Sequence, residues 1–277
     1  MRRLFPIALA AVAGCFGDST GQRLATAERD NAVRYPPTRQ YDVRILRDSF
    51  GVPHIHGRHD DDAAYGLAWA HAEDDYATLE EVLIATRGRA GAKSGKDGAA
   101  SDFVLNWMHV RETVSAKARA EIDSATWALL EGYAAGFNAY AAAHPGEVSG
   151  VARDLLPMTP HDIVAGFVLR SPFFFGLDQV IAALTKGTPL PGDAIEERGS
   201  NGFAVAPSRS ADHKSRLIAN SHQPWTGPVA WYELTVHSDD GWDYAGALFP
   251  GSPVPLLGHN KTIGWTNTVN KPDLIDL

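Results

Sequence analysis

The feature that most constrains the fold of this chain is a change of character at Gly199. Before this residue, apolar side chains recur at helical spacing, whereas short runs of β-forming residues separated by turns follow it. The segment just before the change, 186–199, holds prolines, glycines and charged residues without apolar periodicity, which is typical of a linker. The sequence therefore predicts a helical half, a linker and a β half that begins at Ser200.

The helical half, 41–185, is predicted to open with two short strands and to continue with three helices. The strands are expected at 41–48 and 52–56. Apolar residues three and four positions apart predict helices at 60–87, 115–143 and 159–184. Pro172 predicts a kink in the last helix. The segment 88–101, which is rich in glycine, alanine and lysine, is interpreted as a surface loop.

The β half, 200–277, is predicted to consist of strands joined by turns such as Ser-Asp-Asp-Gly at 238–241. Strands are expected at 203–206, 216–220, 231–237, 242–248 and 262–267. The composition, with 44% hydrophobic and 21% charged residues, is ordinary for a globular protein. The formal net charge of -8, without a basic stripe, argues against nucleic acid as a partner.

The N-terminus has the pattern of a secretory signal peptide, 1–15. Arg2 and Arg3 precede an apolar run, 4–14, that is too short to span a bilayer. The chain's single cysteine, Cys15, follows small residues, as in a bacterial lipoprotein, where the cysteine becomes a lipidated membrane tether. The alternative is an ordinary signal peptide with an incidental cysteine. Either interpretation predicts export of the protein to the periplasm or beyond. Residues 16–40 are interpreted as a polar tether.

Ser200 is a candidate nucleophile if the chain is cut in front of it. A serine at a free N-terminus carries its own base, because an α-amino group has a reference pKa of about 7.7–8.0 and is partly neutral near pH 7. Gly199 would leave its carbonyl open to the serine hydroxyl, since glycine has no Cβ. The alternative is that Gly-Ser-Asn, 199–201, forms an ordinary turn, because all three residues favour turns.

Four blocks resemble, in order, those of the penicillin acylase family of N-terminal-nucleophile hydrolases, which includes penicillin, cephalosporin, acyl-homoserine-lactone and aculeacin-type acylases. They are DSFGVPHI at 48–55, Tyr65-Gly66 with AHAED at 70–74, GSNGFAV at 199–205, and GHNKTIGW at 258–265. The resemblance covers most of the chain from about 41 onward. It implies an α+β fold, namely an αββα sandwich of stacked antiparallel sheets, here incomplete.

The resemblance implies a role for each residue of the site. Ser200 would be the nucleophile, and self-cleavage after Gly199 would leave an intramolecular heterodimer of two chains. His222 would orient the freed α-amine, Val269 would supply a backbone N–H of the oxyanion hole, and Asn201 would hold the new terminus. The alternatives are a surface-loop histidine at position 222 and an ordinary strand valine at position 269.

No cofactor is expected for catalysis, but the resemblance implies a structural calcium site. Asp273 and Asp276 align with carboxylates that bind calcium in penicillin G acylases. Calcium takes six to eight oxygen ligands, so the set is incomplete even with Asp178 and the Ile275 carbonyl. His71 and Asp75, four apart on a predicted helix, could form a metal pair, but a satisfied core histidine is the favoured interpretation. Asp75 also stands where the family commonly has arginine.

The function implied is hydrolysis of the N-acyl amide bond of a small molecule such as a β-lactam, an N-acyl-homoserine lactone or a lipopeptide. His222 with Val269 favours the lactone or lipopeptide side. Aromatic residues are candidates for an apolar acyl pocket, with core packing as the alternative: Phe174, Phe175, Trp225 and Trp231. The family's second chain is longer than the β half here, so we expect an N-terminal portion that lacks the second oxyanion-hole residue. The competing hypothesis is a non-catalytic exported binding lipoprotein of the same fold.

Overall fold

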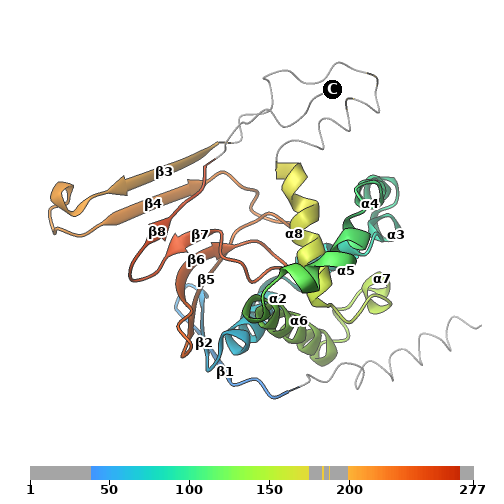
Figure 1. Ribbon diagram of the computed structural model, residues 1–277, viewed down its shortest axis with the longest axis horizontal. Helices are drawn as coiled ribbons and strands as arrows, with labels where there is room; N and C mark the ends of the chain where they lie inside the picture. The colour runs from blue at the N-terminus through green and yellow to red at the C-terminus, as the bar shows by residue number, and fades with distance from the viewer. Residues whose placement is uncertain (1–38, 175–182, 184–186, 188–198, 269–277) are drawn as a thin grey trace, which may run out of the picture.

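The computed structural model describes residues 39–174, 183, 187 and 199–268 (Figure 1). The helical half opens with two antiparallel strands, β1 (Val43–Arg47) and β2 (Pro53–Gly57). Its helices are α2 (Asp60–Thr86), α3 (Ala90–Ser94), α4 (Lys96–Trp107), α5 (Val110–Glu121), α6 (Ser124–Ala143), α7 (Gly150–Arg153) and α8 (Pro160–Phe174). The predicted linker, 186–199, lies outside the described residues except for its positions 187 and 199.

Within its described residues, 200–268, the β half holds six strands and a short 3-10 turn, η1 (Pro207–Arg209). The strands are β3 (Ser200–Val205), β4 (Arg216–Ser221), β5 (Tyr232–Ser238), β6 (Asp243–Leu248), β7 (Leu257–His259) and β8 (Gly264–Trp265). β3 and β4 form a separate antiparallel hairpin, which projects from the main body in Figure 1. The α+β class expected from the sequence is thus confirmed.

The main sheet combines strands from both halves of the chain. Its order is β1-β2-β5-β6-β7-β8, and β2 pairs with β5 in parallel whereas all other neighbours are antiparallel. Along β5 the side chains alternate, and the buried Leu234 and Val236 join the same core cluster as Ile55 of β2 and the helix α2. The helices lie to one side of this sheet (Figure 1). The sheet therefore holds the segments before and after Ser200 together.

The longest helix, α2, is kinked at Asp75, whose backbone has φ -155° and ψ 65°. The Asp75 carboxylate accepts the backbone N–H of Thr78 at 3.2 Å, so it acts as an N-cap for the second part of the helix. α2 packs against α6 at close range. A Cβ on Gly132 or Gly136 of α6 would lie 2.2 Å from a carbonyl oxygen of α2, so only glycine permits this approach.

Two expectations for the helical half are wrong. The segment 88–101 is not a loop, because it contains α3 and the first half of α4. The Asp102 carboxylate accepts the N–H groups of Ala90 and Gly91, both at 2.8 Å, and so caps α3 from the neighbouring helix. The segment 115–143 is two helices, because Asp123 starts α6 by accepting the N–H groups of Ala125 and Thr126, both at 3.0 Å.

The strands of the β half were located within a few residues, apart from the last. The expected strand at 262–267 is reduced to the two residues of β8, and β7 was missed. Both strands are short pairings that end the sheet, and so short a run carries little periodicity. The described part of the third predicted helix is α8, and Pro172 lies inside it.

Candidate active site

The β3–β4 hairpin places His222 beside Ser200. Ser200 is the first residue of β3 and pairs with Ser221, the last residue of β4. His222 follows directly, so the antiparallel register sets it opposite Gly199. Two residues that are 22 positions apart are therefore brought to the open end of one hairpin.

Two contacts join His222 to Gly199. The His222 backbone N–H donates to the Gly199 carbonyl oxygen at 3.2 Å. The imidazole lies against the same residue, since a Cβ on Gly199 would be 3.3 Å from Nδ1. The carbonyl in front of Ser200 is therefore polarised by a hydrogen bond, and the space that a larger residue would need is taken by the ring.

The imidazole is also held from the strands. Asn201 of β3 and Asn220 of β4 are a cross-strand pair, and their Nδ2 atoms lie 3.2 and 3.4 Å from Nε2 of His222. Asn201 was expected to stabilise the new terminus, and the structure places it on the histidine. Asn220 was missed in the sequence. The only signal for it is its position two residues before His222, on the same face of a strand.

The segment after β8 runs beside β3. A Cβ on Gly202 would lie 2.7 Å from Thr266 Cγ2 and 3.8 Å from Thr268 Cγ2. Gly202 lies two residues after Ser200, and Thr268 directly precedes Val269. The contact therefore places the segment that leads to Val269 close to Ser200. Val269 itself, like Asp273, Asp276, Asp178 and Ile275 of the calcium hypothesis, lies outside the described residues.

His71 is a buried core histidine, as favoured, with 2% exposure. Its ring stacks on that of Tyr232 at a centroid distance of 3.8 Å and an interplanar angle of 3°. Burial, with a smaller effect of the nearby Arg170 cation, lowers the pKa of His71 to about 3, so the ring is neutral. The expectation that this histidine is fully satisfied is wrong, because Nδ1 has no hydrogen-bond partner within the described part of the chain.

Metal ligation finds no support in the residues described. Among them, no group of three or more histidine, cysteine, aspartate or glutamate side chains is arranged to hold a metal ion. The carboxylate of Asp75, the proposed partner of His71, instead caps the second part of α2.

The aromatic pocket candidates do not form one group. Trp225 is fully exposed on the loop after His222. Trp231 stacks on Phe249 at a centroid distance of 4.3 Å, which is a packing contact between two segments of the β half. Phe175 and the side chain of Phe174 lie outside the described residues.

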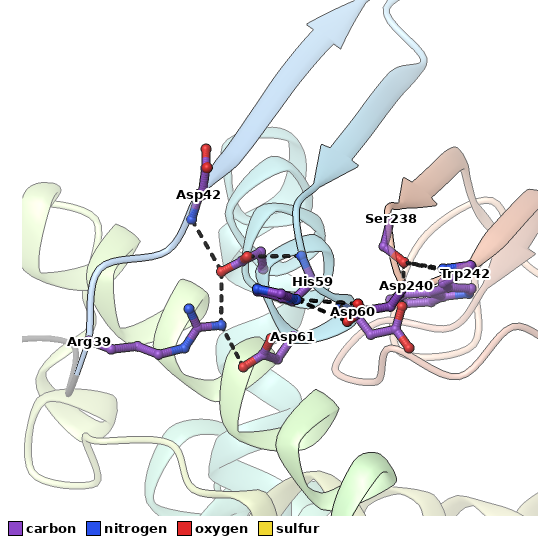
Figure 2. Close-up of polar contacts among 10 residues, drawn as sticks. Arg39, Asp42, His59, Asp60, Asp61, Ser238, Asp240 and Trp242 are labelled. Carbon is purple, nitrogen blue, oxygen red and sulfur yellow. Dashed lines mark hydrogen bonds and ion pairs between the residues drawn. The ribbon is translucent and has the colours of Figure 1, made fainter.

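Polar contacts tie the two halves together away from the hairpin. At one end of the sheet, His59 Nδ1 lies 3.1 Å from an oxygen of Asp240, and the Ser238 hydroxyl donates to Asp60 (Figure 2). Elsewhere, the Tyr232 hydroxyl donates to Asp74 at 2.6 Å. These contacts cross the position of Gly199 in the sequence, so they would persist after a cut there.

Comparison with known proteins identifies the class to which this mixed sheet and hairpin belong. The sequence profile of the penicillin amidase family matches residues 42–277, and the chain belongs to this family. None of the described helices is long and apolar enough to cross a membrane.

Several curated proteins are similar to the chain. It is 28% identical to the acyl-homoserine lactone acylase PvdQ of Pseudomonas fluorescens, over 87% of this chain and 34% of that protein. It is 31% identical to PvdQ of Pseudomonas putida, over 82% of this chain and 33% of that protein. Aculeacin-A acylase of Actinoplanes utahensis is 23% identical, over 83% and 34% respectively. The chain thus spans about a third of the length of these relatives.

Among solved structures, the thermostable penicillin G acylase from Alcaligenes faecalis is similar, with 20% identity and a TM-score of 0.40. The match covers 55% of this chain and 87% of that chain.

Proposed function

We propose that this chain is part of an exported N-acyl amide hydrolase that cuts itself between Gly199 and Ser200 and then uses Ser200 as its nucleophile. The observation that carries this proposal is the contact of His222 with Gly199, through the backbone at 3.2 Å and through the ring. Family membership and the names of the relatives support amide hydrolysis as the reaction.

Self-cleavage would begin with attack of Ser200 Oγ on the Gly199 carbonyl carbon. Negative charge then develops on the Gly199 oxygen, where the His222 N–H already donates. The C–N bond breaks, the serine proton passes to the leaving nitrogen, and an ester joins Gly199 to Ser200 Oγ. One water hydrolyses this ester to a carboxylate on Gly199 and a free Ser200 hydroxyl.

Substrate turnover would reuse the same atoms. The new α-amine takes the Ser200 hydroxyl proton as Oγ attacks the substrate carbonyl, and it passes that proton to the leaving amine. Water then releases the acid from the acyl-enzyme. We further propose Val269 as an oxyanion donor, in keeping with the approach of Thr266 and Thr268 to β3. Acyl-homoserine lactones or lipopeptides are the proposed substrate class, in keeping with the relatives' names.

Three further features belong to this proposal. After the cut, the two chains would remain a heterodimer, because β2 and β5 are neighbours in one sheet. A structural calcium at Asp273 and Asp276 is proposed from the family resemblance, as is export by the signal sequence with a lipid tether at Cys15. Radiolabelled palmitate incorporation in cells, compared between the native protein and Cys15→Ala, tests the tether.

The reaction itself is tested with the full-length protein. We expect it to release the acid from an N-acyl-homoserine lactone or a fatty acyl anilide, and rapid acid quenching should trap the acyl group on the fragment that begins with Ser200. Turnover by a Ser200→Ala variant, or an acyl adduct on the other fragment, would contradict the proposed nucleophile.

A further inference from the structure

A pair of asparagines on the β3–β4 hairpin meets one nitrogen of His222. Asn201 and Asn220 face each other across the two strands. Their Nδ2 atoms approach Nε2 of His222 at 3.2 and 3.4 Å, from one strand each. Both asparagines and the histidine are exposed, so packing against a core does not account for this convergence.

The chemistry of these groups assigns the proton of the imidazole. An amide NH₂ group can only donate, so Nε2 must accept from both asparagines and cannot itself carry a hydrogen in this arrangement. In a neutral histidine, the hydrogen bond made by one ring nitrogen decides which nitrogen is protonated. The proton therefore lies on Nδ1, which is the nitrogen next to Gly199.

We propose that Asn201 and Asn220 are positioning residues, which hold the imidazole of His222 in the tautomer that carries Nδ1–H on the side next to Gly199. This inference rests on the proposed role of Ser200 as nucleophile. A donor fixed beside the reacting bond favours acyl transfer because it requires no reorganisation when charge develops.

Among the described residues, Asn201 and Asn220 are the side chains that bond to the His222 ring. On the hairpin face that carries them, the charged side chain is Arg216 at the far end, which is paired with Asp212 at 2.8 Å. Neither the loop from 223 to 231 nor the segment from 264 to 268 contains a charged residue. Within the described residues, no carboxylate, lysine or arginine side chain bonds to His222.

The first test reads the proton directly and does not depend on cleavage. The full chain with Ser200→Ala is labelled with ¹⁵N-histidine, and the His222 signals are assigned by comparison with a His222→Gln spectrum. Near pH 7.5 we expect Nδ1 to carry the proton and Nε2 to be bare. A protonated Nε2 overturns the proposal, even if the wild-type protein cuts itself normally.

The second test follows the pH dependence of self-cleavage. A carboxylate in Asn220→Asp would stabilise the imidazolium, so the acid limb of the rate profile should move up by about one pH unit. Asn220→Gln keeps the amide donor and should restore the wild-type profile. Ile218→Asp adds the same charge to the same face, two cross-strand pairs along the hairpin, and is the matched control.

The outcomes separate the two proposals. If the wild-type chain is never cut, the proposed function fails, whereas the spectrum still decides the state of His222. If Asn220→Asp and Ile218→Asp shift the pH profile equally, the shift is a non-specific electrostatic effect of the added charge, and the positioning role is wrong. If neither shifts it while cleavage proceeds, the positioning role is also wrong.

Discussion

The guanidinium of Arg170 in α8 donates to the carbonyl oxygen of Pro250 at 2.7 Å, and so joins the helical half to the β half. The same Nη1 atom donates to the Pro228 carbonyl at 3.0 Å, on the loop that begins at His222. Burial lowers the pKa of Arg170 to about 10, but the side chain remains charged near neutral pH. It therefore pairs with carbonyl dipoles from two loops of the β half.

Replacing this arginine should weaken the packing of the helical half against the β half. Arg170→Met leaves two carbonyls without their charged donor, and a hydrogen bond to a charged group contributes roughly 1.5–3 kcal/mol. We expect a loss of that order in the free energy of unfolding, measured by urea titration of the uncut Ser200→Ala protein. Arg216→Met is the control, because its ion pair with Asp212 is exposed to solvent and should contribute little to stability. Equal losses in the two variants would show that Arg170 is not a link between the halves.

The buried His71 should make the protein sensitive to acid. Its folded pKa of about 3 lies below the ordinary value of 6.5, so the unfolded chain binds a proton that the folded chain does not. Stability from this group is present above pH 6.5 and is lost as the pH falls toward 3. Between pH 7 and pH 5 the loss should be about 2 kcal/mol.

Urea titration at the two pH values checks this expectation. His71→Phe keeps a ring against Tyr232 and removes the titrating group, so it should lose about 2 kcal/mol less than the wild type over this interval. His213→Asn, at an exposed position, is the control variant and should leave the difference between the two pH values unchanged. Parallel losses in the wild type and His71→Phe would contradict the assignment of the acid sensitivity to His71.

A side chain at position 199 should slow the cut. The Cβ of Gly199→Ala would lie 3.3 Å from His222 Nδ1 and would also hinder approach to the carbonyl. We expect the self-cleavage rate to fall about tenfold or more, since ~1.4 kcal/mol of added barrier corresponds to a factor of ten. The time course of the uncut band measures this rate. Gly146→Ala, where nothing lies within 4 Å of the new Cβ, should cut at the wild-type rate.

How far the sequence predicts this structure differs between its parts. The order of helices and strands followed from periodicity, the Gly199–Ser200 junction from a motif block, and His222 from the family resemblance alone. The segment 88–101 was misread because its glycine and alanine content suits a loop as well as it suits α3 and α4, which pack closely there. A Cβ on Gly98 would lie 2.1 Å from the Ala90 carbonyl oxygen.

The contact of Asn220 with His222 lay beyond the reach of sequence reasoning for a different reason. It depends on the register of β3 against β4, and a shift of one residue would turn Asn220 to the other face of the hairpin. The link from Arg170 to Pro228 and Pro250 likewise joins loops 58 and 80 residues away. Packing of the complete fold, rather than a local pattern, brings such groups together.

The central claim is that Ser200 becomes an N-terminus by the chain's own chemistry. Intact-mass measurement of the purified full-length protein tests it most directly, beside a Ser200→Ala variant prepared in the same way. We predict two chains for the wild type, one of which begins with Ser200, and a single chain for Ser200→Ala. A wild-type protein that stays in one piece, or a Ser200→Ala protein cut at the same bond, would contradict it.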